Sequence, residues 1–302
     1  MTQNQIRQAL KSTYLIDFPD DLFAFWDFAK SCGADKPLLT FAEATGIALE
    51  GPFAILAGEA DAPPNGWHLG TRYYDDPPEF FLVLSGDTDG LHWGYWFDDP
   101  DNSPTRSVAQ YFSRDAFDLM EDGDSLFEAF RLQLEGCQMT TLEYLETDPD
   151  TEQARASYEA RLETYTLYRS RVVQYATGDR PETGEEYYDK YAGISPRSVT
   201  ADTFEGMGIV VPEALYRPLS LGDEELRARA IAGADLSDVV AEAQRALAEG
   251  FPGTALKLGR DLWIGNAGQK QDAYRLLGAA YEALNRPTLQ TLLSRIASTR
   301  EE

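Results

Sequence analysis

Cysteine and histidine are scarce in this sequence of 302 residues, which contains only Cys32, Cys137, His68 and His92. Two cysteines cannot form a disulfide framework, and two histidines leave a Cys/His zinc site with too few ligands. Both histidines stand among aromatic residues, a setting more typical of packed histidines than of catalytic ones. We therefore expect a protein of a reducing compartment that holds no metal.

Long apolar runs are missing as well. No segment approaches the roughly 20 apolar residues that a membrane-spanning helix needs. Residues 1–17 also lack the basic flank and apolar run of a secretion signal. The sequence therefore predicts a soluble protein that has no membrane partner and stays where it is made.

Positive charge is the third shortage. The chain has 26 Lys and Arg against 51 Asp and Glu, a net charge of −25. Residues 1–145 hold 8 basic and 25 acidic residues (−17), and the remainder holds 18 and 26 (−8). Because affinity for phosphate backbones comes largely from Lys and Arg, we expect no direct nucleic-acid binding. Basic partners would be steered to the first half.

Hydrophobic residues are plentiful, at 43%, and their spacing predicts an α+β first half. A core-facing helix is expected between Asp17 and Gly33. Four strand-like runs and one more helix follow, at Phe53–Leu56, Phe80–Leu84, Leu91–Phe97, Ser107–Phe112 and Ser125–Leu134. The turn signal Gly86–Gly90 indicates a hairpin. We therefore expect an antiparallel sheet with helices at both ends.

The second half is expected to be mostly helical. A long helix over Glu152–Tyr175 and an irregular stretch over Gly178–Thr203 precede a short strand at Gly208–Val211. Gly and Pro then separate five helical segments, at Asp223–Ile231, Leu236–Glu249, Gly253–Trp263, Gln271–Leu284 and Thr288–Ala297. The pattern predicts an α+β domain over residues 1–145, a bridging helix and linker over 146–205, and a helical domain over 206–302.

Glu249 stands at the end of one of these predicted helices, just before Gly250–Gly253. Unsatisfied carbonyls make the potential negative at a helix C-terminus, so a carboxylate is disfavoured there. One interpretation is an ordinary exposed glutamate that tolerates this small cost. The other is a general base, because the negative potential raises the proton affinity of the carboxylate. The local pattern leaves both open.

Seven segments carry a family resemblance, in this order: Phe18–Trp26, Gly51–Gly58, Tyr73–Phe80, Gly94–Asp101, Thr203–Pro212, Tyr216–Leu219 and Leu256–Leu262. Together they resemble the histone PARylation factor family, over about residues 13–112 and 200–298. The chain is similar to an acidic, bacterial-type member. It would then be cytoplasmic, whereas eukaryotic relatives are nuclear.

The resemblance implies an accessory factor of an ADP-ribosyltransferase of the poly(ADP-ribose) polymerase kind. Such a factor docks on the catalytic domain and completes its active site for ADP-ribosylation of serine on a protein substrate. Counted back without a gap from Leu256–Leu262, the family's catalytic glutamate is Glu249, and Tyr216 and Arg217 match the pair that binds the transferase. NAD is the partner's substrate, and the resemblance implies no cofactor bound by this chain alone.

One departure concerns Ala248, where the family usually has an acid that contacts the transferase. Basic residues that would approach nucleosomal DNA are also not evident. Two binding modules remain as alternatives. The acidic, aromatic-rich first half resembles SMI1/KNR4-like proteins of the immunity type, and Tyr274–Leu284 resembles one helix pair of a peptide-binding tetratricopeptide scaffold. An enzyme acting alone is disfavoured because no NAD-binding motif is recognisable.

Overall fold

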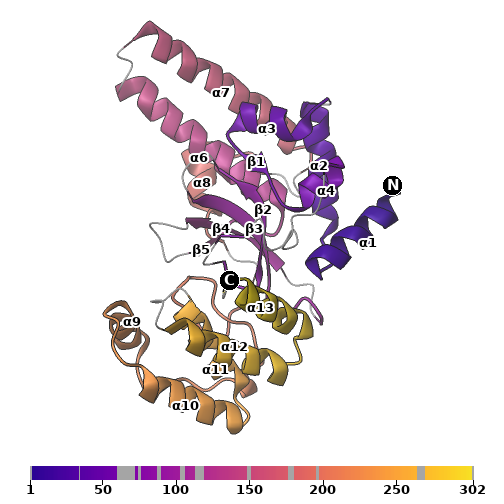
Figure 1. Cartoon of the computed structure of the whole chain (residues 1–302). Coiled ribbons are helices and arrows are strands. Elements are labelled where there is room, and N and C mark those ends of the chain that lie inside the picture. The colour runs from indigo at the N-terminus through magenta and orange to yellow at the C-terminus, as the bar shows by residue number, and fades with distance from the viewer. Residues whose placement is uncertain are drawn as a thin grey trace.

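A computed structural model gives the structure of the chain (Figure 1). The described residues are 2–33, 35–59, 72–73, 76–86, 90–102, 106–112, 119–147, 151–175, 180–194, 197–263 and 269–300. An antiparallel sheet lies in the middle of the molecule, with one group of helices on its upper side and the C-terminal helices at the opposite end (Figure 1). The α+β class expected from the sequence is confirmed.

Within the described residues, five strands form the sheet in the order β1-β2-β3-β4-β5, all antiparallel. They are β1 (Ala48–Leu49), β2 (Phe80–Ser85), β3 (Leu91–Phe97), β4 (Arg106–Phe112) and β5 (Leu119–Glu121). Gly86 donates its backbone N–H to the carbonyl of Leu91 and closes the predicted β2–β3 hairpin. Both faces of β3 are buried, because the helices of the first half cover one face and the C-terminal half covers the other.

Seven helices accompany the sheet within the described residues of the first two thirds of the chain. They are α1 (Gln3–Tyr14), α2 (Asp20–Cys32), α3 (Pro37–Thr45), α4 (Pro52–Ala57), α6 (Leu126–Thr147), α7 (Glu152–Val172) and α8 (Glu185–Tyr191). The predicted helix that ends at Gly33 is confirmed as α2, whose Phe25 and Phe28 rings pack against Phe127 and Phe130 of α6. Helices α6 and α7 lie side by side as a hairpin that projects beyond the body (Figure 1).

The described residues of the C-terminal part form a short 3-10 turn, η1, and five helices. They are η1 (Glu213–Leu215), α9 (Asp223–Ile231), α10 (Ser237–Ala248), α11 (Pro252–Trp263), α12 (Lys270–Ala283) and α13 (Pro287–Arg300). Every residue of α11 is buried, so this helix is the centre of the C-terminal part. Gly259 lets α12 approach closely, because a Cβ there would lie 2.8 Å from Leu277 Cγ. The five predicted helices are confirmed.

A buried charge cluster joins the two parts of the molecule. The guanidinium of Arg260 on α11 contacts Glu79 beside β2 (Nη1–Oε1, 3.3 Å) and Glu205. The Tyr281 hydroxyl on α12 donates to the same Glu79 carboxylate at 2.7 Å. All four side chains are buried. Because unpaired buried charges are costly, this cluster keeps the C-terminal helices in one place against the sheet.

A second buried charged residue, Arg197, contacts several groups in the same region. Arg197 donates to Asp98 (Nε–Oδ2, 2.7 Å) and to Glu121 (Nη1–Oε1, 2.6 Å). Its Nη1 also donates to the carbonyl of Met207 at 2.7 Å. The segment that leads into the C-terminal part is therefore held against β3 and β5.

Three local predictions were wrong. Phe53–Leu56 is not a strand but lies in α4, because Gly51 and Pro52 start a helix and Gly58, with φ of +73°, ends it. The stretch over 178–203 is not wholly irregular, since it contains α8. In place of a strand at Gly208–Val211, the backbone makes one isolated bridge between Ala201 and Ile209. Phe53–Leu56 and Gly208–Val211 are too short to show a period of hydrophobicity. The residues that flank each run therefore decide its secondary structure.

Two kinds of feature are absent from the described residues. No helix among them combines the length and apolar character that crossing a membrane requires. In the part of the chain that the structure describes, no group of three or more His, Cys, Asp or Glu side chains is placed to hold a metal ion.

Candidate functional site

The segment that carries Tyr216 and Arg217 lies against the start of α11. Gly253 makes this possible, because a Cβ at that position would lie 2.9 Å from the carbonyl oxygen of Leu215. The buried hydroxyl of Thr254 then holds the backbone of Arg217 from both sides. It accepts from the Arg217 N–H at 3.1 Å and donates to the Arg217 carbonyl at 2.6 Å. The direction in which the Arg217 side chain leaves the backbone is thereby set by α11.

Glu249 is the C-cap of α10, directly after the last helical residue, as the sequence predicted to within one residue. Its N–H donates to the carbonyl of Arg245 at 3.0 Å, and Gly250 follows with φ of +94°. The N–H of Phe251 donates back to Ala246 at 2.9 Å. This Gly-centred closure of the helix leaves the Glu249 side chain pointing away from the helix, 55% exposed.

Arg217 and Glu249 form an ion pair on the surface, with 2.5 Å between Nη1 and Oε2. Beneath the pair, the Arg217 guanidinium lies 4.8 Å from the ring centroid of Phe251. Both charged side chains are more than 40% exposed, so solvent screens the pair and it contributes little to stability. The guanidinium also offsets the negative end of α10. The structure thus brings together two of the three residues that the family resemblance selects.

Tyr216 is the third of these residues. It is half-buried near the buried Lys257, which interacts electrostatically with its phenol. Lys257 of α11 contacts Asp261 and Asp223, each at 2.7 Å from Nζ. Burial lowers the pKa of Lys257, but the two carboxylates outweigh burial and the net pKa is raised. Burial raises the pKa of Tyr216, and Lys257 opposes this rise. The phenol is therefore a neutral hydrogen-bond donor near pH 7.

Sequence reasoning missed two residues of this site, Phe251 and Thr254. Both lie in or beside Gly250–Gly253, which was interpreted as a break between helices. A buried threonine directly after a helix-breaking Pro-Gly pair is a weak signal, because the same pattern is common at ordinary helix starts. Ala248, the departure from the family pattern, is exposed beside Glu249 and leaves that neighbouring position without a charge.

The histidine prediction is confirmed for His92. Its ring is fully buried, with Nε2 at 2.9 Å from Asp76 Oδ1 and Nδ1 at 2.8 Å from the carbonyl of Gly90. It stacks on Tyr73 with 4.1 Å between ring centroids. His92 therefore ties the sheet to the segment before it and is not open to a substrate. His68 lies outside the described residues.

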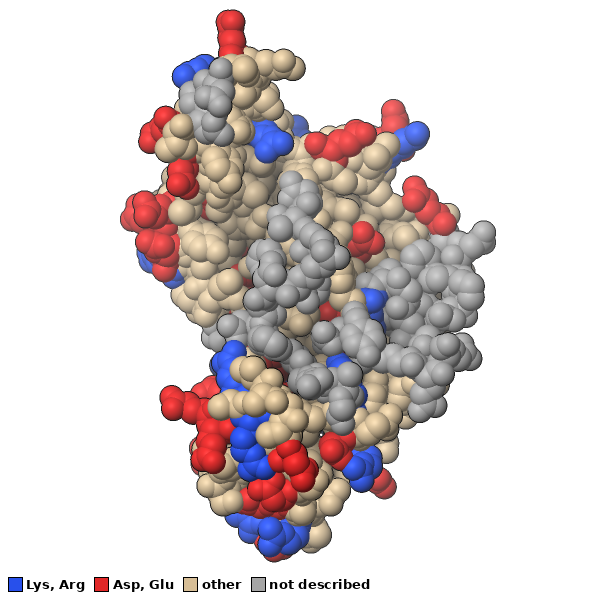
Figure 2. Space-filling model, turned by 60° about the vertical axis from the view of Figure 1, so that its left-hand side comes forward, with Lys and Arg blue, Asp and Glu red and all other residues tan. Residues whose placement is uncertain are grey.

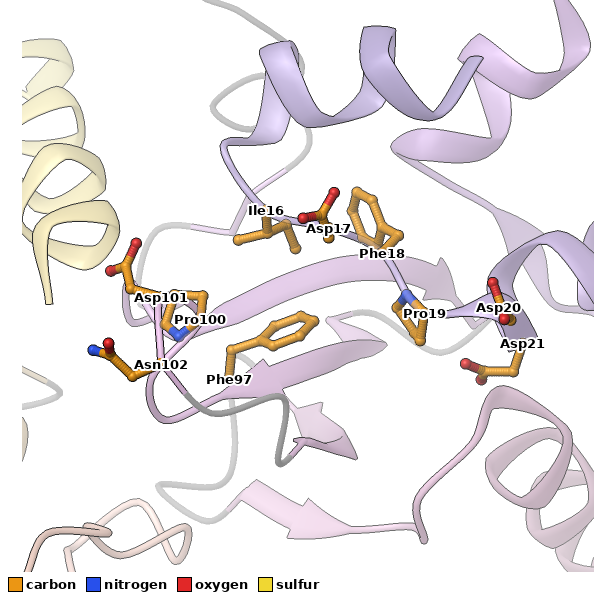
Figure 3. Close-up of a pocket in the computed structure, with 10 residues that line it drawn as sticks. All are labelled: Ile16, Asp17, Phe18, Pro19, Asp20, Asp21, Phe97, Pro100, Asp101 and Asn102. Carbon is orange, nitrogen blue, oxygen red and sulfur yellow. The ribbon is translucent and has the colours of Figure 1, made fainter. Parts of the chain in front are cut away.

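A separate pocket of about 550 Å³ lies between the α1–α2 connection and the end of β3 (Figure 3). Four carboxylates line it, and each already has a partner within the chain: Asp17 has Lys11, Asp20 has Arg7, Asp21 has Tyr95 and Leu126, and Asp101 has Thr288. These contacts tie the carboxylates of the acidic pocket to the rest of the fold. On the face shown in Figure 2, basic and acidic side chains are interspersed over the C-terminal part.

Comparisons with known proteins agree with the resemblance. The sequence model of one family, described as Histone PARylation factor 1, matches residues 5–300. Histone PARylation factor 1 of Mus musculus is 26% identical over 322 residues, covering 99% of this chain and 88% of the relative. The Danio rerio protein of the same name is 28% identical over 239 residues, covering 74% and 61%. The Bos taurus protein is 26% identical over 304 residues, covering 93% and 83%.

These relatives are vertebrate proteins, so the bacterial origin expected for the chain stays a prediction. The match extends through the sheet, the bridging helices and the C-terminal part, which contains Arg217 and Glu249. It covers far more than half of the 302 residues. The chain therefore belongs to the histone PARylation factor 1 family.

Proposed function

We propose that this chain docks on an ADP-ribosyltransferase of the poly(ADP-ribose) polymerase kind and completes its active site for the modification of serine. The observation that carries the proposal is the exposed carboxylate of Glu249, held at a helix end beside Arg217. A general base for a substrate bound by another protein has to be accessible from outside, and Glu249 meets this condition. NAD is bound by the partner in this proposal.

The chemistry explains why a carboxylate is needed. A serine hydroxyl is a weak nucleophile near neutral pH and needs a base within hydrogen-bond reach. Glu249 takes the hydroxyl proton while the serine oxygen forms a bond to the anomeric carbon of NAD. The bond from that carbon to nicotinamide breaks, and nicotinamide leaves as a neutral molecule. The negative charge of Glu249 also favours the positive charge that develops on the ribose.

Arg217 has a second role in this proposal. In the free chain its guanidinium is paired with Glu249, so the base is partly covered. Docking moves Arg217 to a carboxylate on the transferase, with which it forms forked hydrogen bonds, and Tyr216 packs beside it. Glu249 is then free to accept a proton. An exposed pair is a suitable cover because separating it costs little.

The acceptor in this proposal is a basic protein. The names of the relatives refer to histones, which are such proteins. The first half of this chain carries most of the net negative charge, and unlike charges raise the rate of encounter.

The test combines the full chain, a compatible transferase, NAD and a serine-containing substrate. Glu249→Gln is expected to reduce serine labelling by roughly 10²–10⁴-fold, because general-base catalysis contributes about that much. Glu224→Gln, an exposed glutamate on the neighbouring α9, is the matched control and is expected to behave as the parent. Unchanged serine labelling with Glu249→Gln would remove the assignment of the base.

A further inference from the structure

A second pocket, of about 330 Å³, lies on the first half of the molecule, away from Arg217 and Glu249. Its walls come from the turn after β5, the first turns of α6, and the segments on either side of α8. Gly123 forms the turn with φ of +96°, and a Cβ there would lie 2.5 Å from a carboxylate oxygen of Glu128. Only glycine fits, so the backbone comes close to α6 at the base of the pocket.

Asp122 lines this pocket although the residue is only 4% exposed. One carboxylate oxygen, Oδ2, accepts from the indole N–H of Trp93 at 3.0 Å. The other, Oδ1, accepts no hydrogen bond from any described residue. Burial raises the pKa of Asp122 to about 7, and the hydrogen bond from Trp93 opposes the rise. A carboxylate on a residue this little exposed, with no described donor to one of its oxygens, is a candidate for ligand binding.

Glu128 and Arg180, two of the other charged groups around the pocket, are already paired, whereas Asp124 is exposed to solvent. Glu128 contacts Arg180 at 2.5 Å through Oε1 and accepts from the backbone N–H of Asp124 at 3.0 Å through Oε2. Arg180 also lies over the ring of Tyr191, 4.4 Å from its centroid. Three carboxylates therefore face one guanidinium. Among the described residues of the wall, Asp122 is the buried carboxylate with no donor to one of its oxygens, and it attracts positive charge.

The rest of the wall is apolar and suits a long aliphatic stem. Leu132 on α6, the Tyr191 ring and the exposed side chain of Ile194 provide this surface. A lysine side chain has a four-carbon stem and a compact ammonium group, so it can lie along such a wall and reach a single acceptor. Arginine gains most from two free carboxylate oxygens, which Asp122 does not offer.

We propose that this pocket binds a lysine side chain of a basic protein segment, with the lysine ammonium donating to Oδ1 of Asp122. That the segment belongs to the acceptor protein rests on the function proposed above. Lysine binding at this pocket would hold the acceptor on the first half while a serine enters the site near Glu249. The binding step itself needs neither the transferase nor NAD.

The experiment measures binding of a fluorescently labelled peptide of alternating lysine and glycine to the full chain alone. The same peptide with acetylated lysines and one with arginine in place of lysine are measured in parallel. Asp122→Asn keeps the shape of the side chain and an acceptor for Trp93, so the fold is preserved. Asp20→Asn removes one charge from the acidic pocket in Figure 3 and is the matched control.

We expect Asp122→Asn to weaken lysine-peptide binding about tenfold, which corresponds to about 1.4 kcal/mol, and Asp20→Asn to change it less than twofold. Equal weakening by both variants would mean that net charge alone attracts the peptide and would overturn the proposal. Undiminished binding of the acetylated or the arginine peptide would overturn it as well. So would an Asp122→Asn variant that binds as tightly as the parent.

Binding should also strengthen as the pH rises through about 7, because the ammonium pairs with the ionised carboxylate. The other groups around Asp122 are Trp93 on β3, Glu128 on α6, Arg180, and Tyr188 on α8, whose pKa is raised by burial and then by Asp122. Asp122→Asn should remove the pH dependence. Glu249→Gln should leave peptide binding unchanged, so failure of the proposed catalytic role would not be mistaken for failure of this site.

Discussion

Thr254 holds Arg217 by both polar groups of its backbone, accepting from the N–H at 3.1 Å and donating to the carbonyl at 2.6 Å. The hydroxyl is buried in the first turn of α11, the most buried helix of the C-terminal part. An exposed arginine is thereby attached to a rigid element. Rigid attachment matters for a residue that has to meet a partner in one orientation, because ordering a flexible side chain costs free energy.

We expect Thr254→Val to weaken docking on the transferase severalfold, because the two hydrogen bonds to Arg217 are lost at about 1 kcal/mol each. Thr254→Ser keeps the hydroxyl and should restore parent affinity. Affinity measured by calorimetry, together with the melting temperature of each variant, is the readout. If the Val variant melts earlier but docks as tightly as the parent, Thr254 has a structural role only.

Glu249→Gln should dock on the transferase at least as tightly as the parent, and up to about fivefold more tightly. The reason is that an exposed ion pair is worth about 0.2–1 kcal/mol, and the variant no longer has to break it to free Arg217. Arg217→Ala should instead weaken docking, whereas Arg245→Ala, an exposed arginine on α10, should not. Weaker docking of Glu249→Gln would contradict the proposal that the Arg217–Glu249 ion pair has to break before Arg217 binds the transferase.

The stability of Asp122→Asn relative to the parent should increase as the pH rises from about 4 to about 7. Burial raises the pKa of Asp122 from 3.8 to about 7, so the folded parent binds more protons than the unfolded chain between these values. Its stability therefore falls with pH in this window, by about 1–4 kcal/mol, and stays level above it. Urea unfolding at several pH values measures the difference. A constant difference across the window would contradict the raised pKa.

Tyr281→Phe should destabilise the fold by about 1–3 kcal/mol, because the Glu79 carboxylate loses a buried hydrogen-bond donor. The loss should weaken the contact between the sheet and α12, where Arg260 also reaches Glu79. Arg275→Ala removes an exposed pair with Asp272 on the same helix and should change stability by less than about 0.5 kcal/mol. Thermal unfolding of both variants, side by side, provides the measurement.

The sequence predicted most elements because their signals are local. Apolar residues at helical spacing and flanking Gly or Pro were enough for α2 and for α9–α13. Alternation and a Gly-Asp turn were enough for the β2–β3 hairpin. The failures were short apolar runs such as Phe53–Leu56, where neither a period of 2 nor one of 3.6 can be read from four residues.

The candidate site divides in the same way. Glu249 could be selected from the sequence because its position at the end of a helix is a local property, and the family resemblance pointed to Tyr216 and Arg217. The contacts of Thr254 and Phe251 with Arg217 could not be predicted from the sequence, because they depend on how the segment after η1 packs on α11. The pocket at Asp122 gave no sequence signal, since an acidic turn looks the same whether its carboxylate is solvated or buried.

The amino-acid sequence by itself determined the α+β class, the order of most helices and strands, the acidity of the first half and the family. These follow from residue type and from spacing over a few turns, which short-range sterics and hydrophobic burial control. Only the tertiary structure decided that Arg217 meets Glu249 and that Arg260 meets Glu79. It also decided that Asp122 is buried and that, within the described residues, only one of its carboxylate oxygens accepts a side-chain hydrogen bond. Such relationships join residues far apart in the chain, and their geometry exists only when the whole core is packed.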